Sequence, residues 1–403
     1  MIEQTSKPAV PLEDFASIVG LDHAFERDGK LYLSPANTEE IAAVLRLANS
    51  EGIVVHPMGS GTKSAWSDAP RSGIVLRTSR LNAVLDHTWQ DMTCSVQTGC
   101  TWAAMQLTLA AHGQFVALDP LWPEQATIGG IVATNESGAL RLKYGSLRDL
   151  VIGMTIVLAD GTVARTGGKV VKNVAGYDLH KLMTGAFGTL GFITEINFRL
   201  HSLPTARESF TVSSQTVEPL GELMLHLVDS HLSLHALQLR THEGIFHLDI
   251  ELASLPQTLD EHRLLLEAIA HEKQLRIVAA AADIWQRRAL LFDQQDTFTI
   301  KATMLPTEIA RFSGVISGLA GSAITQATGI MMAMLPASAS EKIPSLREQL
   351  AVSGGSLTVL SQPLSSNLDR WGPLPDSFPV MQRLKERFDP QRTLNPGCFL
   401  GGI

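Results

Sequence analysis

The chain has 403 residues, of which 45% are hydrophobic and 18% charged, and its formal net charge is −8. This length is too great for one ordinary core and predicts at least two domains, while the composition excludes a wholly disordered chain. No run of basic residues could follow a phosphate backbone, so nucleic acid is not expected as a partner.

The three cysteines, Cys94, Cys100 and Cys398, form neither a disulfide framework nor a self-contained four-cysteine iron–sulfur site. Residues 1–14 carry acids and prolines in place of the apolar core of a signal peptide. The sequence contains no stretch of about 18 apolar residues that could span a membrane. We therefore expect a cytoplasmic protein that reaches the inner membrane only peripherally, through a partner.

The N-terminal half predicts a βαβ-like unit over residues 31–56. Its helix is expected to begin after Thr38 as the N-cap, with two glutamates in the first turn, and to end before Gly52. Further elements are predicted in this half: strands over 74–78 and 93–97, a helix over 101–112, a hairpin of 151–158 and 162–165 around Asp160-Gly161, and an extended strand from Phe192 to about Leu200.

After Pro204, strands and helices of similar length alternate. Each half of this region repeats the order β-α-β-β-α-β, which predicts one α+β domain with a duplicated ferredoxin-like layout. The predicted strands are 208–214, 235–240, 245–252 and 275–280, then 298–304, 322–327, 330–334 and 356–361. The predicted helices are 216–230, 258–271, 307–319 and 340–351, and a last one at about 379–388 follows a loop over 365–376.

The first chemical motif is the loop over residues 55–63, in which two glycines one residue apart let backbone N–H groups turn toward an anion. Thr62 and Lys63 add a hydroxyl donor and a cation. A Rossmann loop would need a third glycine where Ser64 stands, and a Walker A loop would need glycine where Thr62 stands. The usual nicotinamide and nucleoside-triphosphate loops are therefore disfavoured, and an ordinary tight loop stays an alternative.

Two further glycine-rich segments carry small side chains that let a flat ligand approach the backbone. One is Ala126-Thr127-Ile128-Gly129-Gly130-Ile131-Val132-Ala133-Thr134-Asn135-Glu136-Ser137-Gly138. The other begins at Gly176-Tyr177-Asp178-Leu179 and continues as Gly185-Ala186-Phe187-Gly188-Thr189-Leu190-Gly191-Phe192-Ile193-Thr194-Glu195.

In this order, the three motifs resemble the PCMH-type FAD-binding domain of the vanillyl-alcohol-oxidase family, from residue 25 to about residue 204. Phe388-Asp389-Pro390 and Leu394-Asn395-Pro396-Gly397 resemble the closing segment of that family, which returns to the flavin domain. The resemblance implies an α+β protein with an N-terminal segment (1–24), a PCMH-type FAD-binding domain (25–204), an α+β cap domain (205–364) and a C-terminal segment (365–403) that packs on the FAD domain.

The resemblance also implies where FAD would bind. The first loop would hold the pyrophosphate, the second segment would run beside the ribityl chain and flavin ring, and the third would present its backbone to the ring or the adenine. The implied cofactor-binding residues are Pro57, Met58, Gly59, Ser60, Gly61, Thr62, Lys63, Pro120, Thr127, Ile128, Gly129, Gly130, Ala133, Thr134, Asn135, Gly138, Gly191 and Ile193. Many relatives attach FAD through a histidine in the first loop or a cysteine in the second segment. This chain has neither, since His56 precedes the loop, so non-covalent FAD is expected.

Within the family, the string Gly168-Lys169-Val170-Val171-Lys172-Asn173-Val174-Ala175-Gly176-Tyr177-Asp178 resembles FAD-binding subunits of bacterial glycolate oxidase, also called glycolate dehydrogenase. Gly185-Ala186-Phe187-Gly188 fits as well, because the larger subunit usually has Gly-Ser-Glu-Gly there. That larger subunit carries a His-x-Gly-Asp-Gly-Asn-x-His element whose histidines can hold a divalent metal for the substrate. This chain has no such element, so no metal site is predicted.

The resemblance implies a complex that oxidises glycolate, or a related 2-hydroxy acid, to the 2-oxo acid. Its partners would be a larger FAD-binding catalytic subunit and an iron–sulfur subunit. In one hypothesis this chain takes the hydride itself, with Lys172 and His180 as candidates for carboxylate binding and proton transfer. In another, its FAD only relays electrons or supports assembly, which the missing histidine element favours. A stand-alone FAD-dependent D-2-hydroxy-acid dehydrogenase is the third alternative.

Overall fold

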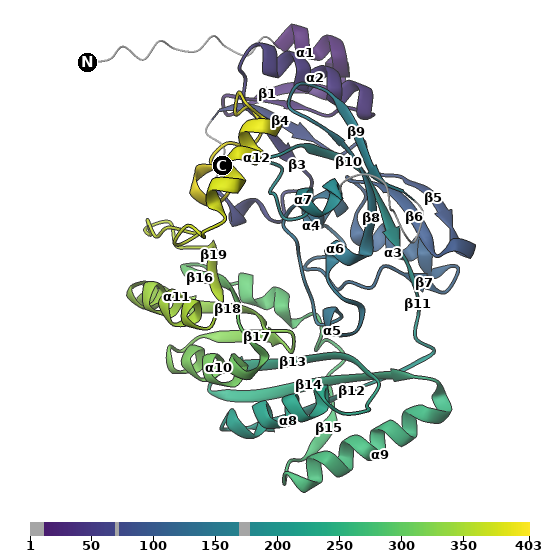
Figure 1. Ribbon diagram of the computed structural model, residues 1–403, viewed down its shortest axis with the longest axis vertical. Helices are drawn as coiled ribbons and strands as arrows, with labels where there is room; N and C mark the ends of the chain where they lie inside the picture. The colour runs from purple at the N-terminus through teal and green to yellow at the C-terminus, as the bar shows by residue number, and fades with distance from the viewer. Residues whose placement is uncertain (1–11, 69–71, 169–177) are drawn as a thin grey trace.

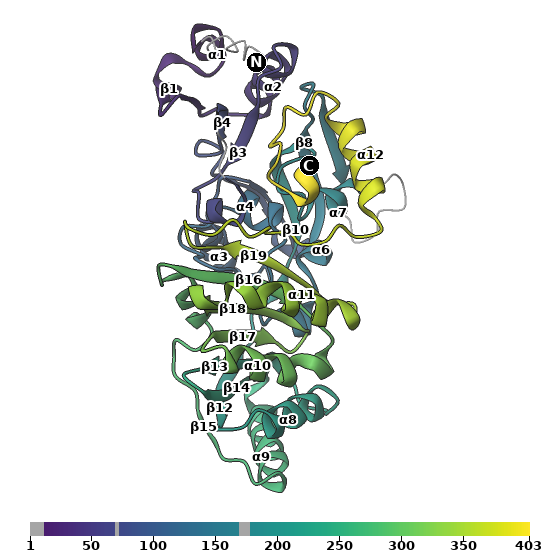
Figure 2. The ribbon, with the colours of Figure 1, turned by 90° about the vertical axis from the view of Figure 1, so that its left-hand side faces the viewer.

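The computed structural model describes residues 12–68, 72–168 and 178–403. Figures 1 and 2 show two α+β bodies stacked along the long axis of the molecule, which we call the N-terminal domain and the cap domain. The last helix, α12 (Phe378–Phe388), lies beside the N-terminal domain although it follows the cap in sequence. The structure thus confirms the expected α+β class and the return of the chain's end to the first domain.

The first sheet of the N-terminal domain has four strands in the order β1-β2-β4-β3. They are β1 (Ala24–Arg27), β2 (Lys30–Leu33), β4 (Gly73–Arg77) and β3 (Val55–Met58). β2 and β3 both run parallel to β4, which lies between them. The apolar stripe of helix α2 (Thr38–Ser50) and helix α1 (Leu12–Val19) share one buried core with these strands.

The start of α2 corrects one expectation. The N-cap is Asn37, not Thr38: the Asn37 side chain accepts a hydrogen bond from the Glu40 backbone N–H at 2.8 Å. The Glu40 carboxylate in turn accepts from the Ala36 N–H at 2.7 Å. Asparagine satisfies a free N–H of the first turn as well as threonine does, so the sequence alone did not separate these neighbours.

The second sheet is antiparallel, in the order β5-β6-β10-β8-β9. Its strands are β5 (Val84–Thr88), β6 (Thr93–Gln97), β10 (Phe192–Arg199), β8 (Val151–Val157) and β9 (Val163–Gly167). β8 and β9 form the predicted hairpin. The remaining elements of the domain are α3 (Trp102–Ala110), α4 (Ile128–Ala133), α5 (Arg141–Tyr144), α6 (Leu147–Leu150), α7 (Leu179–Met183) and the strand pair β7 (Gln114–Phe115) and β11 (His201–Ser202).

The cap domain is a single eight-stranded sheet in the order β15-β12-β14-β13-β17-β18-β16-β19. The first four strands are β12 (Ala206–Ser214), β13 (Leu234–His242), β14 (Ile245–Ser254) and β15 (Ile277–Ala279). The second four are β16 (Thr297–Thr303), β17 (Ser322–Gln326), β18 (Ile330–Pro336) and β19 (Ser356–Ser361). Each group has the strand order of a ferredoxin-like unit, and β13 pairs with β17 to join them edge to edge.

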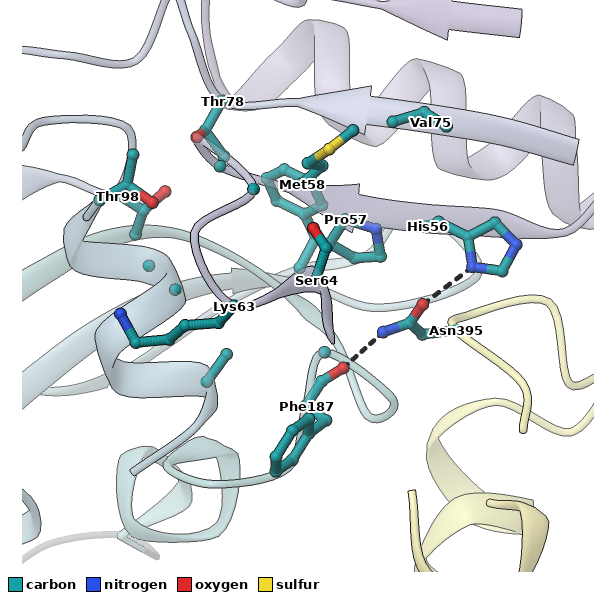
Figure 3. Close-up of a pocket in the computed structure, with 18 of the residues that line it drawn as sticks. His56, Pro57, Met58, Lys63, Ser64, Val75, Thr78, Thr98, Phe187 and Asn395 are labelled. Carbon is teal, nitrogen blue, oxygen red and sulfur yellow. Dashed lines mark hydrogen bonds between the residues drawn. The ribbon is translucent and has the colours of Figure 1, made fainter. Parts of the chain in front are cut away.

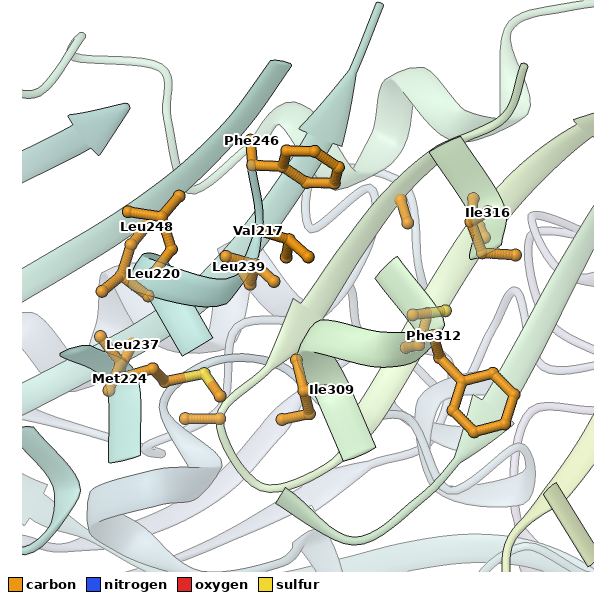
Figure 4. Packing of buried hydrophobic residues seen from close by; sticks show 14 of the residues in the cluster. Val217, Leu220, Met224, Leu237, Leu239, Phe246, Leu248, Ile309, Phe312 and Ile316 are labelled. Carbon is orange, nitrogen blue, oxygen red and sulfur yellow. The ribbon is translucent and has the colours of Figure 1, made fainter. Parts of the chain in front are cut away.

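Four helices accompany the cap sheet: α8 (Glu218–Val228), α9 (Pro256–Glu272), α10 (Ile309–Gly318) and α11 (Ile343–Val352). Side chains from these helices and from alternate strand positions form one continuous apolar core. Figure 4 shows part of it, where α8 and α10 meet strands β13 and β14. The duplicated ferredoxin-like layout predicted from the sequence is therefore the layout of the cap.

A buried lysine fastens the C-terminal segment to the N-terminal domain. Lys385 is 1% exposed, and its ammonium donates to the Thr189 carbonyl at 2.8 Å, the Leu394 carbonyl at 2.7 Å and the Asp389 carboxylate at 2.7 Å. Leu394 forms a parallel bridge with Val55 of β3. The tail thus lies against the strand that leads into the first glycine loop.

Candidate functional site

A cavity of about 280 Å³ lies between the two sheets of the N-terminal domain (Figure 3). Its volume is close to the lower end of the range of roughly 300–1,000 Å³ usual for small-molecule sites. All three glycine-rich motifs contribute to its wall, together with strands β2 and β4 and the C-terminal segment. Segments far apart in sequence thus meet at this single cavity.

The first loop lines the cavity along its whole predicted length, from Pro57 to Lys63. Gly61 has a φ of 81°, a conformation that favours glycine. Gly59 packs so closely on Thr127 that an added Cβ would overlap the threonine hydroxyl. A larger residue at Gly59 would therefore push the first loop away from the second segment.

Five predicted residues of the second segment line the cavity: Thr127, Gly129, Gly130, Ala133 and Thr134. They belong to α4 and its two ends, so this segment is mainly a short helix. Three other predicted residues of this segment, and Pro120 before it, do not line the cavity. Ile128 is fully buried in the core beneath, Pro120 and Asn135 lie outside the lining, and a Cβ on Gly138 would overlap the Asp119 carboxylate. For Gly138, tight packing explains the glycine without a ligand.

The third segment lines the cavity with the predicted Gly191 and Ile193. Sequence reasoning missed further lining residues on this and other elements: Lys30, Tyr32, His56, Ser64, Ser67, Val75, Thr78, Thr98, Phe187, Gly188, Phe192, Asn395 and Cys398. Asn395 could have been found, because it belongs to the Leu-Asn-Pro-Gly string of the tail. The lining residues of β2 and β4 belong to no glycine-rich or other motif that could have predicted them. They face the cavity because successive side chains of a strand point to opposite faces of the sheet.

Asn395 connects two walls of the cavity. Its Nδ2 donates to the Phe187 carbonyl at 2.6 Å, and its Oδ1 lies 2.8 Å from His56 Nδ1 (Figure 3). His56 Nε2 lies 3.2 Å from the Ser72 carbonyl. Burial lowers the pKa of His56, with the hydrogen bonds to Asn395 and Ser72 acting in the opposite direction.

Beyond the cavity, a buried ionic cluster joins the two domains. The ammonium of Lys63 lies 2.8 Å from the carboxylate of Glu136, and the two side chains are 5% and 0% exposed. From the cap side, Arg288 donates to the Ser137 carbonyl at 2.6 Å and the Asp119 carbonyl at 2.5 Å. The guanidinium also lies 3.8 Å from Glu136. The second glycine segment is therefore clamped between the first loop and the cap.

Strand β16 of the cap brings a second cation to the same region. The Lys301 ammonium donates to the Asn135 carbonyl at 3.4 Å, and within the described residues it has no carboxylate within 4.0 Å. Burial lowers the pKa of Lys301, and the more distant Glu136 opposes that shift. An amine at such depth without a carboxylate partner is costly, so an anionic ligand would stabilise it.

The two predicted catalytic residues gain no support from this geometry. Lys172 lies outside the described residues. His180 is 4% exposed on α7 and does not line the cavity, and burial lowers its pKa. Within residues 12–68, 72–168 and 178–403, no three histidine, cysteine or acidic side chains come together as a metal site. No helix of these ranges is long and apolar enough to cross a membrane.

The cavity fits FAD on features of its own. The glycines at positions 59, 61, 129 and 130 leave backbone accessible, as a pyrophosphate or a flat ring requires. Ser60, Thr62 and Thr134 offer hydroxyls, and Lys30 offers a cation. The buried hydroxyl of Thr78 lines the cavity without a hydrogen-bond partner among the described residues. A bound ligand with polar oxygens would satisfy it.

Comparison with known proteins agrees with this reading. Residues 30–167 match the family described as "FAD binding domain". The chain is 34% identical over 197 residues to "Glycolate oxidase subunit GlcD" of Bacillus subtilis, covering 49% of this chain and 42% of that protein. It is 37% identical over 170 residues to a "D-lactate dehydrogenase" of Archaeoglobus fulgidus, covering 42% of this chain and 38% of that protein.

The fold has relatives among solved structures. An alkyldihydroxyacetonephosphate synthase superposes with a TM-score of 0.68 over 91% of this chain and 75% of its own, at 20% identity. This likeness shows the fold alone. The match to the curated relatives spans less than half of their length. FAD is the cofactor of this domain.

Proposed function

We propose that this member of the PCMH-type FAD-binding family takes part in the oxidation of glycolate, or a related 2-hydroxy acid, to the 2-oxo acid. In this proposal it is the FAD-binding subunit of a complex and holds FAD without a covalent bond. The similarity to proteins named glycolate oxidase and D-lactate dehydrogenase supports the substrate class. Bound FAD would supply the redox chemistry by accepting the hydride.

The observation that carries the proposal is Lys301. Its ammonium lies beside the second glycine segment at the Asn135 carbonyl, with no carboxylate within 4.0 Å among the described residues. A 2-hydroxy acid has a carboxylate next to the carbon that is oxidised. Lys301 would bind this carboxylate and orient the substrate, and the surrounding cap sheet would exclude water. A charge-assisted hydrogen bond of this kind contributes about 1.5–3 kcal/mol.

The second candidate function is electron relay without substrate binding. The aromatic side chains around Lys63 favour electron relay, because they occupy space that a substrate would need. The Lys63 ammonium lies 5.7 Å from the ring centres of both Trp66 and Trp122. Phe292 of the cap packs on the same two rings. These side chains fill the space between the first loop and the cap and leave less room for a substrate. In this alternative a larger FAD-binding subunit would oxidise the 2-hydroxy acid.

In either form we propose an iron–sulfur subunit as the electron acceptor. The chain's three cysteines are buried, and they are too few for a four-cysteine cluster. One-electron carriers would therefore come from another polypeptide. We expect both partner subunits to be recovered together with the chain from its native host. We also expect the complex to attach to the inner membrane only peripherally.

The deciding experiment measures reduction of the bound flavin by glycolate and by D-lactate without oxygen. If the chain binds substrate, Lys301→Met is expected to raise the substrate concentration for half-maximal reduction about 10- to 100-fold, with FAD content unchanged. Lys273→Met, which removes an outer cap lysine paired with Glu222, serves as the matched control. Equal reduction in Lys301→Met and wild type would refute the role of Lys301. Reduction only in the presence of the partner subunits would favour relay.

A further inference from the structure

Both ring nitrogens of His56 face hydrogen-bond acceptors. Nδ1 lies 2.8 Å from Asn395 Oδ1, and Nε2 lies 3.2 Å from the carbonyl oxygen of Ser72. A neutral imidazole carries one N–H, whereas an imidazolium carries two. Only the protonated form of His56 can donate to both partners at once.

The orientation of Asn395 is fixed by its other contacts, so it cannot turn a donor toward His56. Its Nδ2 donates to the Phe187 carbonyl at 2.6 Å, and a flipped amide would place two oxygens against each other there. The Cys398 thiol also donates toward Asn395 Oδ1, at 3.3 Å. The amide oxygen therefore faces the histidine, and it accepts from both side chains.

Without a ligand, the surroundings of His56 disfavour the charge. The residue is 6% exposed, and burial lowers its pKa. Lys30, on strand β2 of the same sheet, lowers the pKa further by repulsion. Among the described residues, the other titratable groups on the cavity wall are Tyr32, Lys63, which is paired with Glu136, and Cys398. Burial raises the pKa of the Cys398 thiol, which keeps that thiol neutral. The hydrogen-bond geometry thus favours a charged His56, whereas burial and Lys30 disfavour that charge.

We infer that His56 takes up a proton when FAD binds and then, as an imidazolium positioned by Asn395, stabilises the anionic cofactor through its charge. FAD brings the negative charges of its pyrophosphate into a cavity whose wall includes His56 and Lys30. A nearby negative charge raises the pKa of a histidine and offsets the cost of burial. Asn395 acts as a positioning residue, because its amide oxygen keeps Nδ1 in the donor role.

The sign of the pH dependence follows from proton linkage. Binding that takes up a proton is strengthened as the pH falls through the window between the lowered pKa of the free chain and the raised pKa of the complex. Within that window the Kd for FAD is expected to rise by up to about tenfold for each pH unit. The described part of the cavity wall contains no other histidine, so replacing His56 should abolish this slope.

The test uses the full chain freed of flavin and titrated with FAD by calorimetry at several pH values between about 5 and 8. At each pH the titration is repeated in two buffers of different ionisation enthalpy, which gives the number of protons taken up. Wild type is expected to take up a fraction of a proton approaching one, and His56→Gln none, with a flat Kd across the range. His87→Gln is the matched control, because His87 also binds an amide oxygen, that of Gln114, outside the cavity.

The inference concerns FAD binding and does not depend on the substrate proposed above. Wild-type binding without proton uptake anywhere in this range would overturn it, as would undiminished uptake in His56→Gln. If His56→Gln does not fold, Asn395→Asp provides the second variant. Its carboxylate keeps an acceptor for His56 and favours the imidazolium before FAD binds, so proton uptake should fall. Undiminished uptake in Asn395→Asp would then contradict the inference.

Discussion

The cap domain and the N-terminal domain bury their apolar residues in different ways. In the cap, alternate strand positions and the inner faces of the helices form one continuous apolar core. The N-terminal domain divides its core between two sheets and keeps a cavity between them, lined largely by glycines and hydroxyl side chains. The cap is thus stabilised by packing within repeated units. The cavity of the N-terminal domain depends on contacts between segments far apart in sequence.

The largest loss of stability is expected when the buried lysine of α12, Lys385, is replaced. Lys385→Met leaves the Asp389 carboxylate buried without its cation, so the N-terminal domain is expected to lose about 3–5 kcal/mol of stability. Binding of FAD should weaken as well, because the tail that carries Asn395 is no longer held. Chemical denaturation followed by far-UV circular dichroism, together with FAD titration, measures both effects. Arg383→Met, an exposed change on the same helix, should stay within about 0.5 kcal/mol of wild type.

A somewhat smaller effect is expected in the cap core. Leu248 is fully buried in β14, and Leu248→Ala should cost about 2–5 kcal/mol of cap stability through the cavity that it leaves. FAD binding should change little, because the flavin cavity is built from other segments. Denaturation followed separately by flavin fluorescence and by far-UV circular dichroism distinguishes the two domains. Loss of FAD in parallel with cap unfolding would show that the domains unfold as one unit.

The same contrast explains what the sequence could predict. In the cap, strand and helix periodicities persist over long segments, so every predicted cap strand and helix is present within a few residues of its predicted bounds. In the N-terminal domain the glycine motifs predicted where the chain would approach a ligand. They could not separate Gly59, which lines the cavity, from Gly138, which is needed for packing against Asp119. Short elements such as β1 and α5 have too few residues for a periodic signal.

The contacts between the cap and the second glycine segment could not be predicted from the sequence either. Arg288 and Lys301 lie more than 140 positions after the second glycine segment, yet they donate to carbonyls of Ser137 and Asn135. Neither residue belongs to a motif, and only the position of the cap sheet against the N-terminal domain brings them there. The catalytic roles suggested for Lys172 and His180 stay predictions.

Extraction of the cofactor tests the central claim most directly. We predict that acid precipitation of the purified wild-type chain releases FAD into the supernatant in an amount equimolar with protein. Gly59→Leu is expected to retain none, although its cap domain stays folded, because a side chain at that position displaces the first loop from Thr127. Recovery of FMN, flavin that stays attached to the precipitate, or full FAD content in Gly59→Leu would contradict the account.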